Sequence, residues 1–275
     1  MFNSEGSGTY SFMGLQVHPA SGTWSWLLDR PGSVMFHVMI CALYCVTVEC
    51  MKIYVKSQST LEKPYKPSPL LIGIMKWHNI ALSIVSLAMG ISFVLDLRVE
   101  GRFNSWHSMS CRNTDNTGNY GIWTMVYLLS KIWEWADTYF LILQGREVIS
   151  LHYFHHMTTF TMAALCHNFP VGGFSFVNCF VHAIMYAYYS NPRPFRWARQ
   201  LITSGQLLQF CLVISIHTYG FLQPKGACFE FQEVRKEWWY CQSVVVGYFL
   251  LFVKFFYDNY IAASAAKAKK VVKAE

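Results

Sequence analysis

The sequence predicts an all-α membrane protein, a helical bundle with seven transmembrane helices. Of its 275 residues, 53% are hydrophobic, 17% are aromatic and only 13% are charged, whereas about 25% of the residues in a typical soluble domain are charged. Apolar runs close to the roughly 20 residues that a helix needs to cross a bilayer recur along the chain. They lie at about 34–55, 71–95, 121–141, 150–167, 174–191, 200–221 and 241–262.

No long linker, low-complexity tract or repeat divides these runs, so residues 1–275 are interpreted as a single integral membrane domain. The N-terminal stretch MFNSEGSGTYSFMG lacks basic residues followed by an apolar segment. We therefore expect no cleaved signal peptide.

The charges of the loops predict the orientation, because Lys and Arg are enriched on the cytosolic side of membrane proteins. The loops after the first, third and fifth runs, with the C-terminal tail, carry twelve Lys and Arg residues, against seven on the opposite side. This asymmetry predicts a cytosolic C-terminus and, with seven spans, a lumenal N-terminus. It also explains the net charge of +7, which gives little support to nucleic-acid binding.

Two cysteines fall in loops assigned to the lumenal side, Cys111 after the second run and Cys228 after the sixth. An oxidising lumen permits disulfides, so we predict a Cys111–Cys228 bond. Cys241 is the competing partner, and two unpaired loop thiols are the alternative.

Polar residues recur inside four consecutive runs, where they are costly and indicate function. In KIWEWADTYF, Lys131, Glu134 and Asp137 share one helix face, although such a ladder could also be a structural charge network. SLHYFHHMTTF places three imidazoles on one stripe, and the next two runs add further polar faces. The residues of these three faces are His152, His155 and His156; Asn178, His182, Met185, Tyr186 and Tyr189; and Gln206 and Gln209.

Isolated glutamines in membrane helices also serve as hydrogen-bonding groups between helices. Four consecutive polar faces are nevertheless interpreted as the lining of one cavity. Two functions suit several imidazoles there. The HxxHH spacing can bind a metal, as in di-iron desaturases and hydroxylases, but these enzymes need several histidine boxes and this chain has one. We therefore expect no metal site. The other function is acyl chemistry, because imidazole, with an unperturbed pKa near 6.5, acts both as a nucleophile and as a general base.

A seven-helix transporter or receptor is a further alternative, because permeation pathways also contain intramembrane charges. The motifs favour acyl chemistry. They resemble the signature of the very-long-chain fatty acid elongases, the ELO family, over roughly residues 30 to 262. KIWEWADT is similar to their KxxExxDT, LHYFHH to LHxxHH, NCFVHAIMYAYY to NxxxHxxMYxYY, and TSGQLLQ to TxxQxxQ. Glu147 and Ser150 depart from the Gln and Phe of many members, which affects the expected acyl-chain preference more than the reaction.

The resemblance implies decarboxylative condensation of malonyl-CoA with a fatty acyl-CoA, which gives a 3-ketoacyl-CoA two carbons longer, CO2 and CoA, without a cofactor. It also implies an acyl tunnel within the bundle and a multi-pass location in the endoplasmic reticulum membrane, among membrane lipids. The expected partners are the other enzymes of the elongation cycle, namely the ketoacyl reductase, the dehydratase and the enoyl reductase. Assembly into a homo-oligomer is left open.

Within this reaction, we expect His155 to accept the acyl group as an acyl-imidazole, with assistance from His182. His152 and His156 would orient the nucleophile and stabilise oxyanions. The other expected roles are tautomer control by Glu134 and Asp137; hydrogen-bond donation by Lys131, Asn178, Gln206 and Gln209; an acyl channel lined by Met185, Tyr186 and Tyr189; and binding of CoA phosphates by Arg146, Arg193, Arg196 and Lys254.

Overall fold

The computed structural model describes most of the chain from residue 33 onward and a few short segments before it. The described residues are 4–5, 9–12, 15–17, 24–25, 33–58, 66–111, 118–166, 175–194, 197–224, 226–228, 235–262 and 264.

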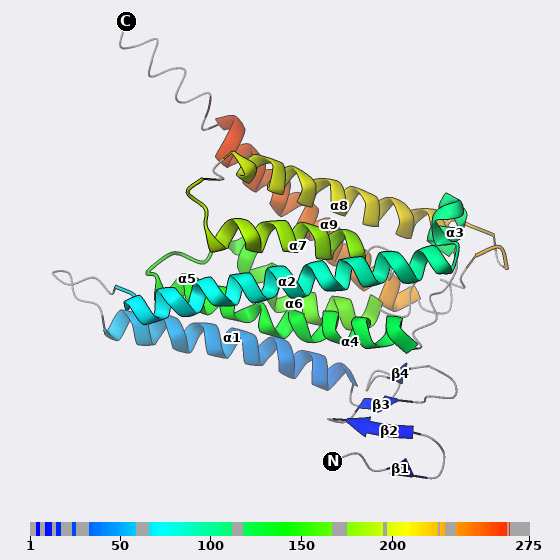
Figure 1. Ribbon diagram of the computed structural model, residues 1–275, viewed down its shortest axis with the longest axis horizontal. Helices are drawn as coiled ribbons and strands as arrows, with labels where there is room; N and C mark the ends of the chain where they lie inside the picture. The colour runs from blue at the N-terminus through cyan, green and yellow to red at the C-terminus, as the bar shows by residue number, and fades with distance from the viewer. Residues whose placement is uncertain are drawn as a thin grey trace, which may run out of the picture.

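Long helices lie side by side along a common direction (Figure 1). They follow the seven predicted ranges to within a few residues, and the third range is divided into two helices. The helices are α1 (Ser33–Ser57), α2 (Pro69–Val99), α4 (Gly118–Trp133), α5 (Trp135–Leu143), α6 (Ser150–Cys166), α7 (Ser175–Ser190), α8 (Ala198–Phe221) and α9 (Arg235–Phe256). A π-helical turn, η4 (Tyr257–Ala262), continues α9.

Among the described residues, four segments are long and apolar enough to cross a membrane by length and composition, namely Met35–Ser57, Pro69–Val99, Ala198–Phe221 and Trp238–Ala262. The remaining helices, α4 to α7, have at most 17 residues each. The chain is therefore a multi-pass helical membrane protein, as predicted. Helices suit a bilayer because every backbone hydrogen bond is made within the segment.

The ends of α2 show how local sequence sets helix boundaries. Ser68 caps its first turn by accepting a hydrogen bond from the Leu71 backbone N–H at 3.2 Å, and Pro69 occupies the first turn. Just beyond its end, Gly101 has φ 67°, a left-handed conformation that glycine adopts readily. A short 3₁₀ turn, η2 (Arg102–Asn104), and the helix α3 (Trp106–Cys111) follow.

The third predicted helix, 121–141, is wrong as one continuous element, because it breaks at Glu134. The Asp137 backbone N–H donates to the Glu134 carbonyl at 3.1 Å, a tighter i to i+3 bond than the α-helical i to i+4 bond. The break places the Glu134 carboxylate, which is buried, at the junction of α4 and α5.

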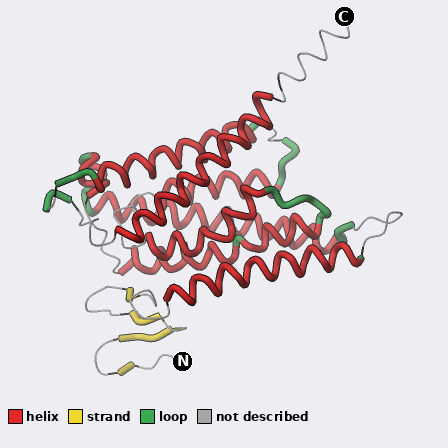
Figure 2. The backbone as a smooth tube through the Cα atoms, turned by 180° about the vertical axis from the view of Figure 1, so that it is seen from behind, coloured by secondary structure: helices red, strands yellow, loops and turns green. Residues whose placement is uncertain are grey.

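The helix contacts close a ring. Helix α2 packs against α7, α7 against α8, α8 against α9, α9 against α6, α6 against α4, and α4 against α2. Helix α1 lies outside this ring, packs against α5 and α6, and runs along one edge of the bundle (Figures 1 and 2). Because each ring helix turns one face inward, the ring brings the predicted polar faces together.

Four short strands precede the bundle and form an antiparallel sheet in the order β1-β2-β3-β4. They are β1 (Ser4–Glu5), β2 (Thr9–Phe12), β3 (Leu15–Val17) and β4 (Trp24–Ser25). The prediction of an all-α protein did not include them, because two to four residues leave no measurable period in a sequence.

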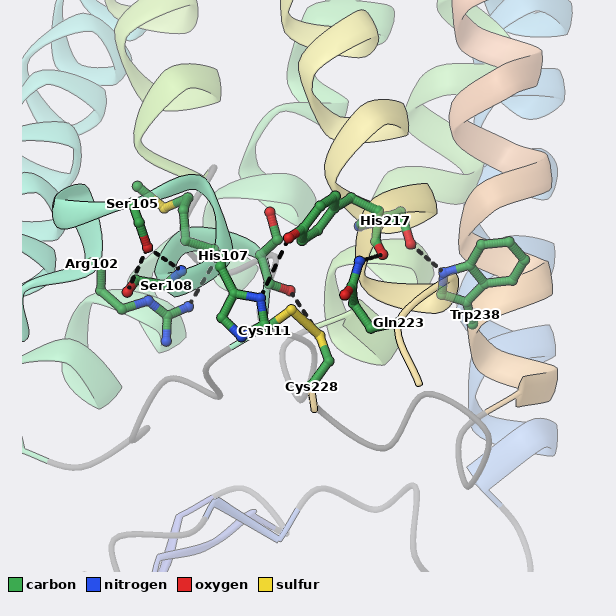
Figure 3. The surroundings of a disulfide bond; sticks show 12 residues. Arg102, Ser105, His107, Ser108, Cys111, His217, Gln223, Cys228 and Trp238 are labelled. Atoms are coloured by element: carbon green, nitrogen blue, oxygen red, sulfur yellow. Dashed lines mark hydrogen bonds between the residues drawn. A yellow bond between two sulfur atoms is a disulfide. The ribbon is translucent and has the colours of Figure 1, made fainter. Parts of the chain in front are cut away.

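A disulfide joins Cys111, the last residue of α3, to Cys228 in the connection between α8 and α9 (Figure 3). The pair bonds as the sequence suggested, and the competing residue Cys241 is not its partner. Near it the Arg102 side chain is fully buried and donates from Nη2 to the Met109 carbonyl at 3.3 Å. This end of the bundle is opposite the α5–α6 connection, which precedes the histidine box (Figure 1).

Candidate active site

A buried ion pair lies at the break between α4 and α5. The Lys131 Nζ is 2.8 Å from the Glu134 Oε1, and the two residues are 2% and 1% exposed. Lys131 also donates to the Asn178 Oδ1 at 3.2 Å, and the Tyr127 hydroxyl donates to the same oxygen at 3.0 Å. Residues from α4 and α7 thus hold the ammonium and the carboxylate in fixed positions.

His182 faces this pair from α7. Its Nδ1 is 3.5 Å from the Glu134 Oε1, but the contact does not meet hydrogen-bond geometry, so the buried Nδ1 has no hydrogen-bond partner. The imidazole therefore lies beside a fixed negative charge.

The three imidazoles of the histidine box of α6 have different surroundings. His152 and His156 have ring centroids 4.3 Å apart. The His152 Nε2 is 3.0 Å from the Thr138 hydroxyl, which is 2.9 Å from the Tyr44 hydroxyl of α1. His155 is only half-buried, and its Nδ1 is buried without a hydrogen-bond partner.

The histidine box also contacts the helix that follows the break. The Trp135 Nε1 donates to the His156 carbonyl at 3.0 Å. Helices α4 and α5, which carry Lys131, Glu134 and Asp137, therefore contact both the histidine box of α6 and His182 of α7.

Asp137 has a different set of partners from Glu134. Its Oδ1 is 2.9 Å from the His78 Nε2, and its Oδ2 accepts from the Tyr186 hydroxyl at 2.5 Å. Sequence analysis did not identify His78 of α2 as a site residue, so this contact was missed. The available signal was an imidazole within an apolar run, which requires a polar partner.

The other predicted site residues separate into enclosed and exposed groups. The Gln206 Nε2 contacts the Met185 Sδ at 3.5 Å, which joins α8 to α7. Gln209 is buried, and its Oε1 has no partner. Tyr186 is fully buried, whereas Tyr189 is 52% exposed and lies outside the enclosed part of the bundle.

The predicted basic residues do not form one cluster. Arg193 and Arg199 line a cavity of about 340 Å³ with Tyr188 and Pro192, where the α7–α8 connection begins and ends. Arg146 is exposed in the α5–α6 connection. Lys254 has a 72% exposed side chain and pairs with Asp258 at 2.7 Å, and Arg196 lies outside the described residues.

In the described ranges of the chain, buried polar atoms without a hydrogen-bond partner include the Nδ1 atoms of His155 and His182 and, on α8, the Oε1 of Gln209. Each such atom costs about 1–3 kcal/mol in a dry interior, so the site suits a polar ligand that supplies the missing hydrogen bonds. Among the described residues, no group of three or more His, Cys, Asp or Glu side chains is placed to hold a metal ion.

The chain matches the ELO (GNS1/SUR4) family over residues 31–268. It belongs to this family. The ELO match covers all four polar motifs and every helix of the ring, so the family resemblance of the motifs is confirmed. The fold of this ELO protein brings the motif of α4 and α5 into contact with those of α6 and α7, and Gln206 of the fourth motif contacts Met185 of the third.

Similar ELO proteins carry elongase names. The chain is 37% identical over 148 residues to human very long chain fatty acid elongase 3, covering 50% of this chain and 53% of that protein. It is 30% identical over 219 residues to mouse very long chain fatty acid elongase 5, and the match covers 73% of this chain and 69% of that protein. A Dictyostelium discoideum fatty acid elongase is 27% identical over 268 residues, and the match covers 92% of this chain and 93% of that protein. The matched region thus spans only about half of the human relative, and 64% of a Caenorhabditis elegans elongase that is 33% identical.

Proposed function

We propose that this ELO protein is a fatty acid elongase that condenses malonyl-CoA with a fatty acyl-CoA. The observation that carries the proposal is two buried imidazole nitrogens without a hydrogen-bond partner, on His155 and His182, of which the His182 Nδ1 lies 3.5 Å from Glu134 of the buried Lys131–Glu134 pair. A nucleophile, a second base and a fixed ammonium are the groups that acyl transfer needs. The elongase names of the relatives support the same substrate class.

In the proposed first step, an imidazole nitrogen of His155 attacks the thioester carbonyl of the acyl-CoA. The carbon–sulfur bond breaks, and the CoA thiolate takes the proton that the imidazole loses, with His182 as the carrier. The product is an acyl-imidazole, which the surrounding helices shield from water. In this proposal, Lys131 and Gln209 stabilise the carbonyl oxygen as it develops negative charge.

In the second step, the malonyl carboxylate leaves as CO2, and its bonding electrons remain on the α-carbon. That carbanion attacks the acyl carbon, the carbon–nitrogen bond breaks, and the imidazole regains a proton from the solvent. The sum is a 3-ketoacyl-CoA that is two carbons longer, CO2 and free CoA, with one proton consumed and no cofactor.

We further propose that the chain crosses the endoplasmic reticulum membrane seven times, with α4 and α5 together forming one span, and that the C-terminus lies in the cytosol. The acyl chain then extends into the helix ring away from the histidines, and the CoA portion stays on the cytosolic side. Arg193 and Arg199 line a cavity at that end and suit CoA phosphates. The enzymes that reduce and dehydrate the 3-ketoacyl product are the expected partners.

The test uses the full-length protein, purified and placed in liposomes, with a saturated acyl-CoA and malonyl-CoA labelled in its free carboxyl group. Labelled CO2 and an unlabelled 3-ketoacyl-CoA are expected in equal amounts, and only when both substrates are present. Ligand-dependent transport without CO2 would instead favour a transporter. The same assay over a series of chain lengths measures the acyl preference.

A second experiment tests the nucleophile. Incubation with acyl-CoA alone is expected to add one acyl mass to the wild-type protein, and peptide mapping should place it on the histidine box. His155→Ala should form no adduct, whereas His107→Ala, which changes an exposed histidine of α3, should react normally. An adduct of wild-type abundance in His155→Ala would rule out His155.

A further inference from the structure

A tyrosine of α9, a helix that carries none of the four family motifs, contacts the proposed nucleophilic segment. Tyr248 is fully buried. Its hydroxyl is 2.7 Å from the Thr158 hydroxyl, 3.2 Å from the Thr159 hydroxyl and 3.4 Å from the His155 carbonyl. Within the part of the chain that the structure describes, this hydroxyl makes its hydrogen-bond contacts with one turn of α6.

That turn of α6 has two adjacent threonine hydroxyls that bond back to the helix. The Thr158 hydroxyl donates to the Phe154 carbonyl at 2.7 Å, and the Thr159 hydroxyl donates to the His155 carbonyl. Threonine hydroxyls that bond the carbonyl four residues earlier slightly destabilise a helix and often bend it. The turn that carries His155 has two such bonds, and the Tyr248 hydroxyl contacts both threonines.

The packing of α9 against α6 is close at the same level. The Tyr248 and His155 rings have centroids 4.8 Å apart, and the Tyr248 and Phe154 rings 5.6 Å apart. A Cβ added to the neighbouring Gly247 would lie 3.4 Å from Phe154. The absence of a side chain at Gly247 therefore leaves room for the α6 turn against α9.

We propose that Tyr248 is a positioning residue for His155: it holds the 155–159 turn of α6 so that the His155 imidazole faces the polar centre. This inference rests on the proposed acyl transfer to His155. Tyr248 acts through the helix and not on the substrate, because its hydroxyl contacts are made with α6. A displacement of about 1 Å in a reacting group can lower a rate on the order of 100-fold, so holding this turn matters for turnover.

The primary test compares two tyrosine-to-phenylalanine variants of the full-length protein in liposomes. Tyr248→Phe removes one oxygen and keeps the ring. Tyr260→Phe is the matched control, because Tyr260 also pairs with a threonine of another helix, Thr203, at 3.2 Å. We expect Tyr248→Phe to lower kcat and the rate of acyl-adduct formation about 10-fold, with KM changed less than twofold. Tyr260→Phe should keep both rates.

The second test asks whether Tyr248 acts through the two threonines. The double variant Thr158→Val and Thr159→Val should reproduce the loss seen in Tyr248→Phe, and adding Tyr248→Phe to it should cause little further loss. Residues that act as one unit show this lack of additivity. Additive losses would mean that the hydroxyl acts elsewhere, which contradicts the proposal.

Two other outcomes would also overturn the inference. Tyr248→Phe could retain the kcat of the Tyr260→Phe control, or it could lower only the melting temperature and the folded fraction, with kcat per folded molecule unchanged. Either result leaves the proposed condensation intact, provided the wild type releases CO2. Absence of CO2 release by the wild type would instead contradict the proposed function itself.

Discussion

Lys131 and Glu134 form an ion pair at 2.8 Å at the break between α4 and α5, where both residues are almost completely buried. Only three positions separate them in the sequence, but the pair also reaches α7 through Asn178 and His182. A buried charge needs its partner and further hydrogen bonds to offset the loss of hydration. The pair therefore acts as a unit, which the first prediction tests.

Lys131→Met should be strongly destabilising, because it leaves the Glu134 carboxylate buried without its ammonium. Loss of one member of a buried pair costs about 3–5 kcal/mol. The combined change Lys131→Met and Glu134→Leu should recover much of the melting temperature but no elongase activity. Thermal unfolding in detergent measures the first effect and labelled CO2 release the second. A double variant less stable than Lys131→Met would contradict the pairing.

His78 is expected to support Asp137, to which its Nε2 is bonded at 2.9 Å. Among the described residues, His78→Leu leaves the carboxylate with the Tyr186 hydroxyl as its donor, and it should destabilise the protein by about 1–3 kcal/mol. His78→Gln keeps an N–H donor near the same position and should restore most of the lost stability. Equal melting temperatures for the Leu and Gln variants would show that the hydrogen bond does not matter.

The Cys111–Cys228 bond should contribute to stability, because it cross-links residues 117 positions apart. Cross-links of this kind typically contribute about 2–4 kcal/mol. Cys111→Ser is expected to lower the melting temperature of protein isolated from its own membrane, and Cys211→Ser, at an exposed free cysteine, should not. Non-reducing peptide mapping checks the bond directly, and two free thiols there would refute it.

Gly90 of α2 should not tolerate a side chain, because an added Cβ would lie 3.2 Å from Phe180 and 3.3 Å from Cys179 of α7. Overpacking of this type costs about 1–3 kcal/mol. We expect Gly90→Val to lower the melting temperature, whereas Gly73→Val, in the same helix with nothing within 4 Å, should have a small effect. A larger loss for Gly73→Val would argue against close contact of α2 and α7 at Gly90.

Arg193 and Arg199 should affect substrate affinity more than turnover, since they line the cavity near the α7–α8 connection. The double variant Arg193→Ala and Arg199→Ala is expected to raise KM for malonyl-CoA about 10-fold. A change of this size corresponds to the free energy of about one charge-assisted hydrogen bond. Lys52→Ala removes an exposed lysine paired with Glu49 and serves as the control. An unchanged KM in the double arginine variant would place the CoA phosphates elsewhere.

Much of this protein could be read from the sequence because the bilayer limits the available structures. Apolar length predicted the positions of the helices, and a period of three to four residues grouped Lys131, Glu134 and Asp137 on one face. The spacing of the motifs indicated the family. These features depend on residues close together in the chain, so the sequence by itself determined them.

Tertiary structure decided which residues face each other across the bundle. Glu134 contacts His182, Asp137 contacts His78, and Tyr248 holds the turn of His155, although these partners come from different helices. Helical periodicity predicts which residues share a helix face, but not which neighbouring helix that face contacts. The break at Glu134 changes the direction of the polar face between α4 and α5. The packing of the helix ring therefore determined which site residues contact each other. The local sequence determined which residues belong to the site.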